Sequence, residues 1–198
     1  MPLVDFDDPE LWNGGPTSLY RDAEGRGYVR ETRGSYYGES GEDAIALRNA
    51  LGVLPGDSII FVGGAFGWIA ELWERDGYGP IVVTDTSAWI HANKAANAVV
   101  EILNEDGATS ESRDAILDAL GVPVATWCIS EDVIPTLTAD EAQAMAANMR
   151  LVADNVAHWV TTKMVAQDER LNWKSLEEWK ALLDPDLVVA RNENGRVI

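Results

Sequence analysis

Hydrophobic and polar residues follow two periods along this chain from about residue 40 onward. Short apolar runs rich in β-branched residues are typical of buried parallel strands, and apolar residues three or four apart are typical of amphipathic helices. Strands are expected at residues 58–63, 81–85, 99–103, 124–130, 156–162 and the final segment from 187. Helices are expected at residues 40–51, from about 68 to 75, 86–98, 114–121, 138–155 and 175–183.

Capping and turn residues support these boundaries. Thr138 with Glu141, and Ser175 with Glu178, each match a capping box. Ser87 and Asp114 are expected to cap their helices, and Gly121 to end one. Residues 99–103 could continue the preceding helix, but Val99, Val100 and Ile102 favour a strand.

Strands that alternate with helices indicate a doubly wound α/β fold. The final segment, LVVARNENGRVI, contains Asn194-Gly195, a pair typical of hairpin turns. We therefore expect a seven-stranded, mostly parallel sheet with a C-terminal antiparallel hairpin, formed by residues 39–198. Residues 1–38 are dense in Gly and Pro and lack periodicity, so we expect an irregular extension draped on that domain.

The charge balance is strongly acidic. Asp and Glu number 33 against 15 Lys and Arg, which gives a formal net charge of −18. Such a surface repels nucleic-acid phosphates and anionic membranes. The stretch richest in arginine, Arg21 to Arg33, is interspersed with acids, which indicates a solvated surface more than a polyanion site.

Cysteine and histidine are scarce. A single cysteine, Cys128, excludes an internal disulfide, and His91 and His158 lack metal-ligand spacing, so no metal site is expected. No apolar run is long enough for a transmembrane helix, and no leader-like pattern opens the chain. A cytoplasmic protein is the default expectation.

The segment SIIFVGGAFGWIAELW (residues 58–73) reads as a strand, a glycine-rich turn and a helix start. In a doubly wound sheet the first such turn lies where ligands bind. Asp85 ends the second strand, and an acid there can accept the ribose hydroxyls of an adenosine ligand. The alternatives are a tight corner without a ligand, and an Asp85 that only caps the next helix.

These motifs resemble those of class I, Rossmann-like S-adenosylmethionine-dependent methyltransferases over roughly residues 40–198. FVGGAFG resembles the first motif of that family, with Phe61 where the family has an acid and Ala65 where it has a glycine. VVTDTS resembles the second-strand acid motif, and the residues from Trp127 to Thr162 resemble the fourth strand, its helix and the fifth strand. The sequence SEDVIPTLTADEA is also similar to sequences of small methyltransferase-like proteins encoded by bacteriophages.

The resemblance implies S-adenosylmethionine as cofactor and an unidentified methyl acceptor. The implied cofactor-binding residues are Gly63, Gly64, Ala65, Gly67, Asp85, Thr86, Trp89, Asp106 and Ser130. Glu131 and His158 are candidate bases, although a histidine within an apolar strand is more often a hydrogen-bonded core residue. Trp89 could equally pack in the core, and Tyr36 and Tyr37 could form a lid or only anchor the extension.

Two other functions stay open at this stage. The first is a binding or structural protein, such as a phage assembly component, that keeps the fold without the chemistry. The second is a nicotinamide-dependent oxidoreductase, which is disfavoured because GGAFG does not match the G-x-G-x-x-G pattern. The oligomeric state is not indicated by the sequence.

Overall fold

A computed structural model describes residues 42–93, 101–103, 107, 109–161 and 172–191. Its helices are α3 (Glu42–Leu51), α4 (Trp68–Arg75), α5 (Ala88–Asn93), α6 (Arg113–Leu120), α7 (Ala139–Met149) and α8 (Leu176–Leu183), with a short 3₁₀ turn η3 (Ile134–Thr136). Its strands are β1 (Ile59–Val62), β2 (Ile81–Thr84), β3 (Glu101–Leu103), β4 (Ala125–Glu131), β5 (Ala153–Thr161) and β6 (Leu187–Arg191).

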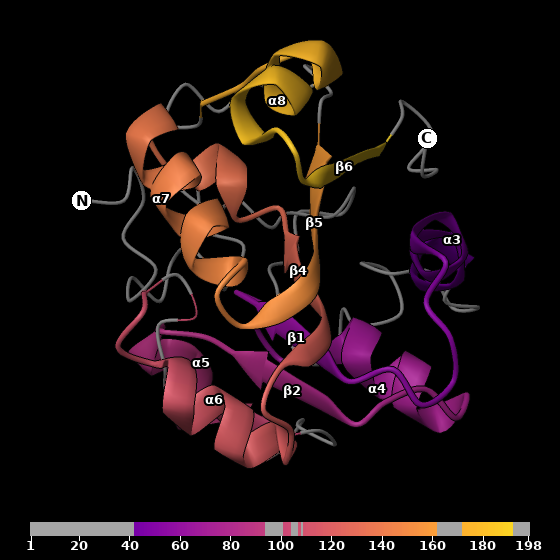
Figure 1. The fold of residues 1–198 in the computed structure, drawn as a ribbon. Helices are drawn as coiled ribbons and strands as arrows, with labels where there is room; N and C mark the ends of the chain where they lie inside the picture. The colour runs from indigo at the N-terminus through magenta and orange to yellow at the C-terminus, as the bar shows by residue number, and fades with distance from the viewer. Residues whose placement is uncertain (1–41, 94–100, 104–106, 108, 162–171, 192–198) are drawn as a thin grey trace.

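The strands form one sheet in the order β3-β2-β1-β4-β5-β6 (Figure 1). Every neighbouring pair is parallel, with Ile59 opposite both Ile81 and Trp127. The chain adds β2 and β3 on one side of β1 and then β4, β5 and β6 on the other, so its direction of winding reverses between β1 and β4. The carboxyl ends of β1, β2 and β4 therefore meet at one edge of the sheet, where open α/β sheets bind ligands.

Both faces of the sheet are covered, which explains why its strands are continuously apolar. Helices α3 and α4 pack on one face, where Trp73 and Phe61 meet edge to face with ring centroids 5.2 Å apart. Helices α6, α7 and α8 cover the other face, where Met145 and Trp179 are fully buried. Burial of a large apolar side chain stabilises the fold by about 1.5–3 kcal/mol, so the two clusters hold the three layers together.

The α/β prediction is confirmed, but the sheet differs from the predicted one in two ways. Six strands are described instead of seven, and no antiparallel pair occurs among the described residues. Strand β6 pairs directly and in parallel with β5, and Ala157 lies opposite Leu187 in this pair. The predicted turn at Asn194-Gly195 lies outside the described residues, as does the predicted extension at residues 1–38.

Most of the predicted helix caps are confirmed. Both capping boxes are present, and the Thr138 and Ser175 side chains each accept a hydrogen bond from the backbone amide of the third helical residue. The Ser87 hydroxyl accepts from the Ile90 amide at 3.2 Å, and Gly121 ends α6 with φ of 74°. The third strand exists at Glu101–Leu103, as favoured.

Two boundaries were wrong. Asp114 does not cap α6, because the helix already begins at Arg113 and Ser112 holds the cap position. Asp114 lies instead in the first turn of α6, where its negative charge still interacts favourably with the helix dipole. Helix α7 ends at Met149 and β5 begins at Ala153, so the periodicity through residue 155 overran the helix. No helix within the described residues has the length and apolar character needed to cross a bilayer.

Candidate functional site

The glycine-rich turn follows β1 at the carboxyl edge of the sheet. Its backbone takes the left-handed conformation at Gly63, Ala65 and Gly67, with φ of 66°, 49° and 71°. Glycine adopts this conformation freely, whereas alanine does so at a cost of about 1 kcal/mol. The turn ends on Gly67 at the N-cap of α4, and this glycine has no side chain with which to cap the helix.

Asp85 joins this turn to the second strand. One carboxylate oxygen accepts the Ala65 amide at 3.0 Å, and the other accepts the Ser87 amide at 2.9 Å. The Gly63 amide bonds the Thr84 carbonyl at 2.8 Å, which fixes the turn on the end of β2. Asp85 therefore bonds the amide of Ser87, the residue before α5, as the capping alternative expected, and it also binds the glycine-rich turn, a contact that the sequence did not predict.

Asp85 is largely buried at the end of β2, with only 9% of the residue exposed. Its two amide partners come from the glycine-rich turn and from the residue before α5. The carboxylate is therefore held in a fixed position at the carboxyl edge of the sheet.

The opposite side of Gly63 is already covered. A Cβ atom on Gly63 would lie 2.3 Å from Cγ2 of Val133, which follows β4. Gly64 is similarly enclosed, since its Cβ would lie 2.8 Å from Val83. Gly63 is therefore favoured by both its positive φ and its close approach to Val133, whereas Gly64 is favoured by its close approach to Val83.

The other predicted site residues divide between this edge and the core. Thr86 is exposed next to Asp85, and Trp89 is half-buried against Phe66 with ring centroids 5.8 Å apart. That contact is the core packing expected as the alternative for Trp89. Glu131 is the half-buried last residue of β4. Asp106, Tyr36 and Tyr37 lie outside the described residues.

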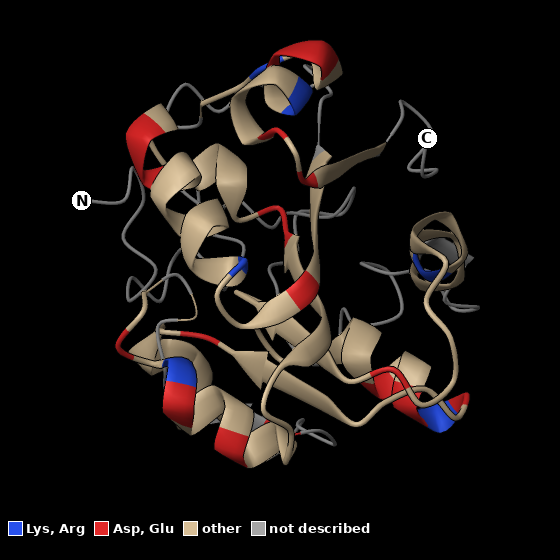
Figure 2. Cartoon of the chain, viewed as in Figure 1, with Lys and Arg blue, Asp and Glu red and all other residues tan. Residues whose placement is uncertain are grey.

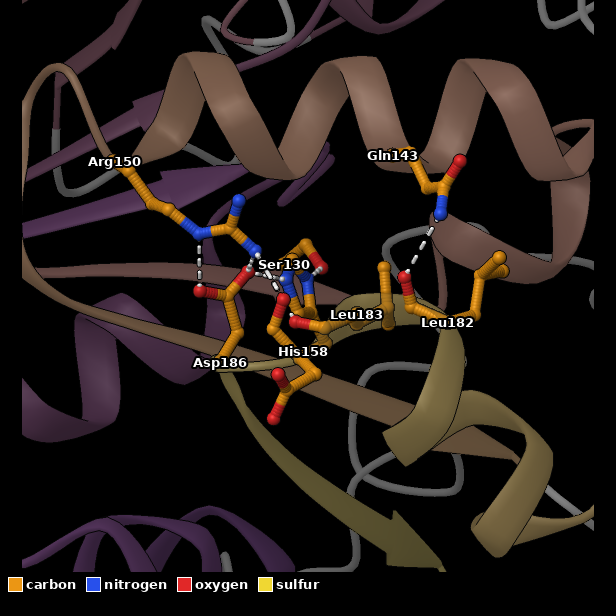
Figure 3. A network of polar contacts seen from close by, with 8 residues as sticks. Ser130, Gln143, Arg150, His158, Leu182, Leu183 and Asp186 are labelled. Atoms are coloured by element: carbon orange, nitrogen blue, oxygen red, sulfur yellow. Dashed lines mark hydrogen bonds and ion pairs between the residues drawn. The ribbon is translucent and has the colours of Figure 1, made fainter.

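Ser130 and His158 belong to a buried polar network instead of an open surface (Figure 3). The Ser130 hydroxyl lies 2.9 Å from Nδ1 of His158, and Nε2 of His158 lies 3.0 Å from Asp186. Both Ser130 and His158 are fully buried, and both ring nitrogens of His158 have partners. This is the hydrogen-bonded core histidine of the alternative interpretation, because a general base must reach a substrate.

Arg150 completes the network from the end of α7. Its guanidinium donates to Asp186 through Nε at 2.7 Å and through Nη2 at 2.9 Å. Burial alone would raise the pKa of Asp186, but the hydrogen bonds and charges of His158 and Arg150 outweigh it and hold that pKa below its ordinary value. Cys128 lies nearby on β4, where burial, with a smaller contribution from the Asp186 charge, raises its pKa far above the ordinary thiol range and leaves it neutral.

Sequence reasoning missed Arg150, Asp186 and Val133. Arg150 and Asp186 are 36 residues apart, and no local pattern links them. Val133 lies in the turn before η3, whose path depends on the non-glycine residue Asp132 having φ of 52°. Ala65 and Asp132 are the described non-glycine residues with positive φ, and both follow neighbouring strands at the carboxyl edge. Such strained positions concentrate at functional sites.

Within the described ranges, no group of three or more His, Cys, Asp or Glu side chains is placed so that it could hold a metal ion.

No protein-family model matches the sequence, and no curated protein is similar to it. Solved structures do share the fold. One is a chain of the complex that contains the Haloferax volcanii Trm112 methyltransferase activator, with a TM-score of 0.57 and 12% identity over 78% of this chain and 71% of that one. Another is magnesium protoporphyrin IX methyltransferase from Synechocystis PCC 6803 with bound S-adenosylhomocysteine, with a TM-score of 0.52 and 16% identity over 73% and 70%.

A third is a protein from an antibiotic biosynthesis pathway of Anabaena variabilis, assigned as a methyltransferase, with a TM-score of 0.52 and 15% identity over 71% of this chain and 58% of that one. The chain spans between 58% and 71% of the length of these three proteins. The fold is therefore the Rossmann-like α/β fold shared with S-adenosylmethionine-dependent methyltransferases.

Proposed function

We propose that the protein is an S-adenosylmethionine-dependent methyltransferase that binds its cofactor at the carboxyl edge of β1 and β2. The observation that carries the proposal is the hydrogen bond from the Ala65 amide to Asp85, which brings the glycine-rich turn and the second-strand acid together. The same two features were singled out in the sequence, and their position at the switch in winding direction is where such folds hold nucleotides.

Asp85 is the residue proposed to hold the ribose hydroxyls, because its carboxylate ends the second strand beside the glycine-rich turn. The turn from Gly63 to Gly67 would face the rest of the adenosine, at the amino-terminal end of α4. S-adenosylmethionine supplies an electrophilic methyl group when bound, so the protein has mainly to position the acceptor.

Glu131 is the proposed general base, because it ends β4 beside the strand that carries the turn. His158 is not proposed for this role, since both ring nitrogens are bonded within the core. We expect Glu131→Gln to lower turnover while cofactor affinity changes little, if the acceptor must lose a proton.

A second candidate is a protein that uses this fold for binding without methyl transfer. Two observations favour it. Phe61 stands at the position of the acid in the resembling family and packs against Trp73 in the core. Val133 covers the face of Gly63. Tight cofactor binding, together with no transfer to small molecules, peptides or nucleic acids, would support this candidate over the enzyme.

Calorimetric titration with S-adenosylhomocysteine tests the proposal. We expect micromolar-range binding to the wild type, and a loss of roughly tenfold or more in Asp85→Ala, because each charge-assisted hydrogen bond contributes about 1.5–3 kcal/mol. Asp118→Ala, which removes an exposed acid of α6, is the matched control and should bind normally.

Two further measurements make the result decisive. Circular dichroism first establishes that Asp85→Ala is folded, because the substitution also removes two hydrogen bonds to backbone amides. NAD is titrated in parallel, since the described strand order β3-β2-β1-β4-β5-β6 is also that of dinucleotide-binding folds. Heat with NAD alone, or no heat with either ligand, contradicts the proposal.

A further inference from the structure

The first part of β5 lacks a neighbouring strand on one side. Strand β4 pairs with β5 from Ala153 onward, whereas pairing with β6 begins only where Ala157 meets Leu187. Residues 153–156 therefore form an open edge within the described part of the sheet. Strand edges of this kind present backbone donors and acceptors to whatever chain lies beside them.

A cavity of about 450 Å³ lies along this open edge. One wall is the segment Ala153 to Val156, the opposite wall is Pro185 to Leu187, and Trp127 and Arg150 complete the lining. The open edge and this cavity are together called the β5 notch. The notch is at the amino-terminal half of β5, so it lies away from the glycine-rich turn and is independent of the proposed cofactor site.

The outer wall of the notch is held in place before any partner arrives. The Arg150 guanidinium bonds both carboxylate oxygens of Asp186 and also the Leu183 and Asp184 carbonyls, at 3.2 and 3.4 Å (Figure 3). Asp186 is further fixed by His158. A wall that is already ordered lowers the entropy cost of binding.

The chemistry of the notch selects a kind of partner. Leu187, which lines the notch, is 43% exposed, and Leu151, two residues before β5 in the chain, is 49% exposed. Asp154 is exposed and makes no ion pair within the described residues, while the charge of Arg150 is neutralised by Asp186. The notch thus offers a strand edge, apolar contacts and an uncompensated negative charge.

We infer that the β5 notch binds an extended segment of a partner protein that carries Lys or Arg between apolar residues and adds to the sheet beside β5. Main-chain hydrogen bonds to an open edge supply affinity in this mode of recognition, and alternate side chains supply specificity. Asp154 would pair with the basic residue, and the net charge of −18 attracts a basic partner over longer distances.

Fluorescence anisotropy at physiological ionic strength, with the full chain and three short labelled peptides, tests this inference. The peptides alternate valine with lysine, valine with glutamate, and proline with lysine. Only the valine–lysine peptide combines positive charge with the ability to form a strand, because proline lacks the amide donor. We expect it to bind at least about tenfold more tightly than either of the others.

Two variants and a second readout localise the binding. Asp154→Lys should weaken the valine–lysine peptide about tenfold, and Asp118→Lys, the same charge reversal on exposed α6, should leave it unchanged. Hydrogen exchange should show protection of residues 153–156 by that peptide. Equal binding of the proline–lysine peptide, equal losses in the two variants, no protection at the edge, or no binding overturns the inference.

Discussion

At the scale of single residues, Asp85 does more than the sequence indicated. Its position at the end of a strand predicted either a ligand-binding residue or a helix cap. In the structure its carboxylate accepts hydrogen bonds from the amides of both Ala65 and Ser87. The bond to Ala65 joins residues 20 apart, which no local pattern specifies. The sequence could therefore single out Ala65 and Asp85 as candidates, whereas the contact between them depends on the register between β1 and β2.

Gly63 gives a test of packing around the turn. Gly63→Ala should lower the free energy of unfolding by about 2–3 kcal/mol, because the new methyl group adds a clash with Val133 to the strain of positive φ. Gly52→Ala is the matched control: Gly52 has φ of 74°, but no atom lies within 4 Å of its Cβ position.

Urea denaturation of the wild type and both variants gives the comparison. The control should lose only about 1 kcal/mol from backbone strain. Adding Val133→Ala should cost less in the Gly63→Ala background than in the wild type, since it relieves the clash. Equal losses at Gly52 and Gly63 would show that Val133 does not restrict this position.

At the scale of elements, the sequence predicted which segments are strands and helices but not how the last strands pair. Helices α7 and α8 were recognisable from their capping boxes and their spacing of buried residues. The parallel pairing of β6 with β5 was missed, because a segment that resembles half of a hairpin can equally pair with a distant strand. The Arg150–Asp186–His158 network, which links α7, β5 and the start of β6, left no local signal for the same reason.

This network predicts a dependence of stability on acid. The pKa of Asp186 is lowered in the folded protein, so the folded state binds fewer protons than the unfolded state. The stabilisation is therefore fully present above the unfolded pKa of about 3.9 and is lost as pH falls through the folded pKa.

Asp186→Asn removes the titrating group. We expect the difference in unfolding free energy between wild type and Asp186→Asn to be largest near neutral pH and to shrink steadily below about pH 4. Asp118→Asn, at an exposed position, should track the wild type throughout. A wild-type advantage over Asp186→Asn that stays constant down to pH 2 would contradict the assigned role of the Asp186 charge.

At the scale of the whole molecule, the proposed cofactor site and the β5 notch lie toward opposite ends of the parallel strands. Lys and Arg occur singly along the described chain and form no continuous basic stretch there (Figure 2). The carboxyl edge carries the glycine-rich turn and Asp85, and the β5 notch lies toward the opposite end of the strands. The sequence indicated the first of these sites through its motifs, while the second exists only because β6 begins four residues later than β5 along the shared ladder.

Cofactor binding at the carboxyl edge is tested most directly by mapping S-adenosylhomocysteine binding on the amide resonances of the full chain by nuclear magnetic resonance. If Asp85 and the glycine-rich turn bind the cofactor, saturable shifts are expected at residues 63–67 and 85–87, with residues 153–156 unaffected, and these shifts should be lost in folded Asp85→Ala. An absence of shifts at the carboxyl edge at millimolar ligand, or shifts confined to another part of the molecule, would contradict cofactor binding at this edge.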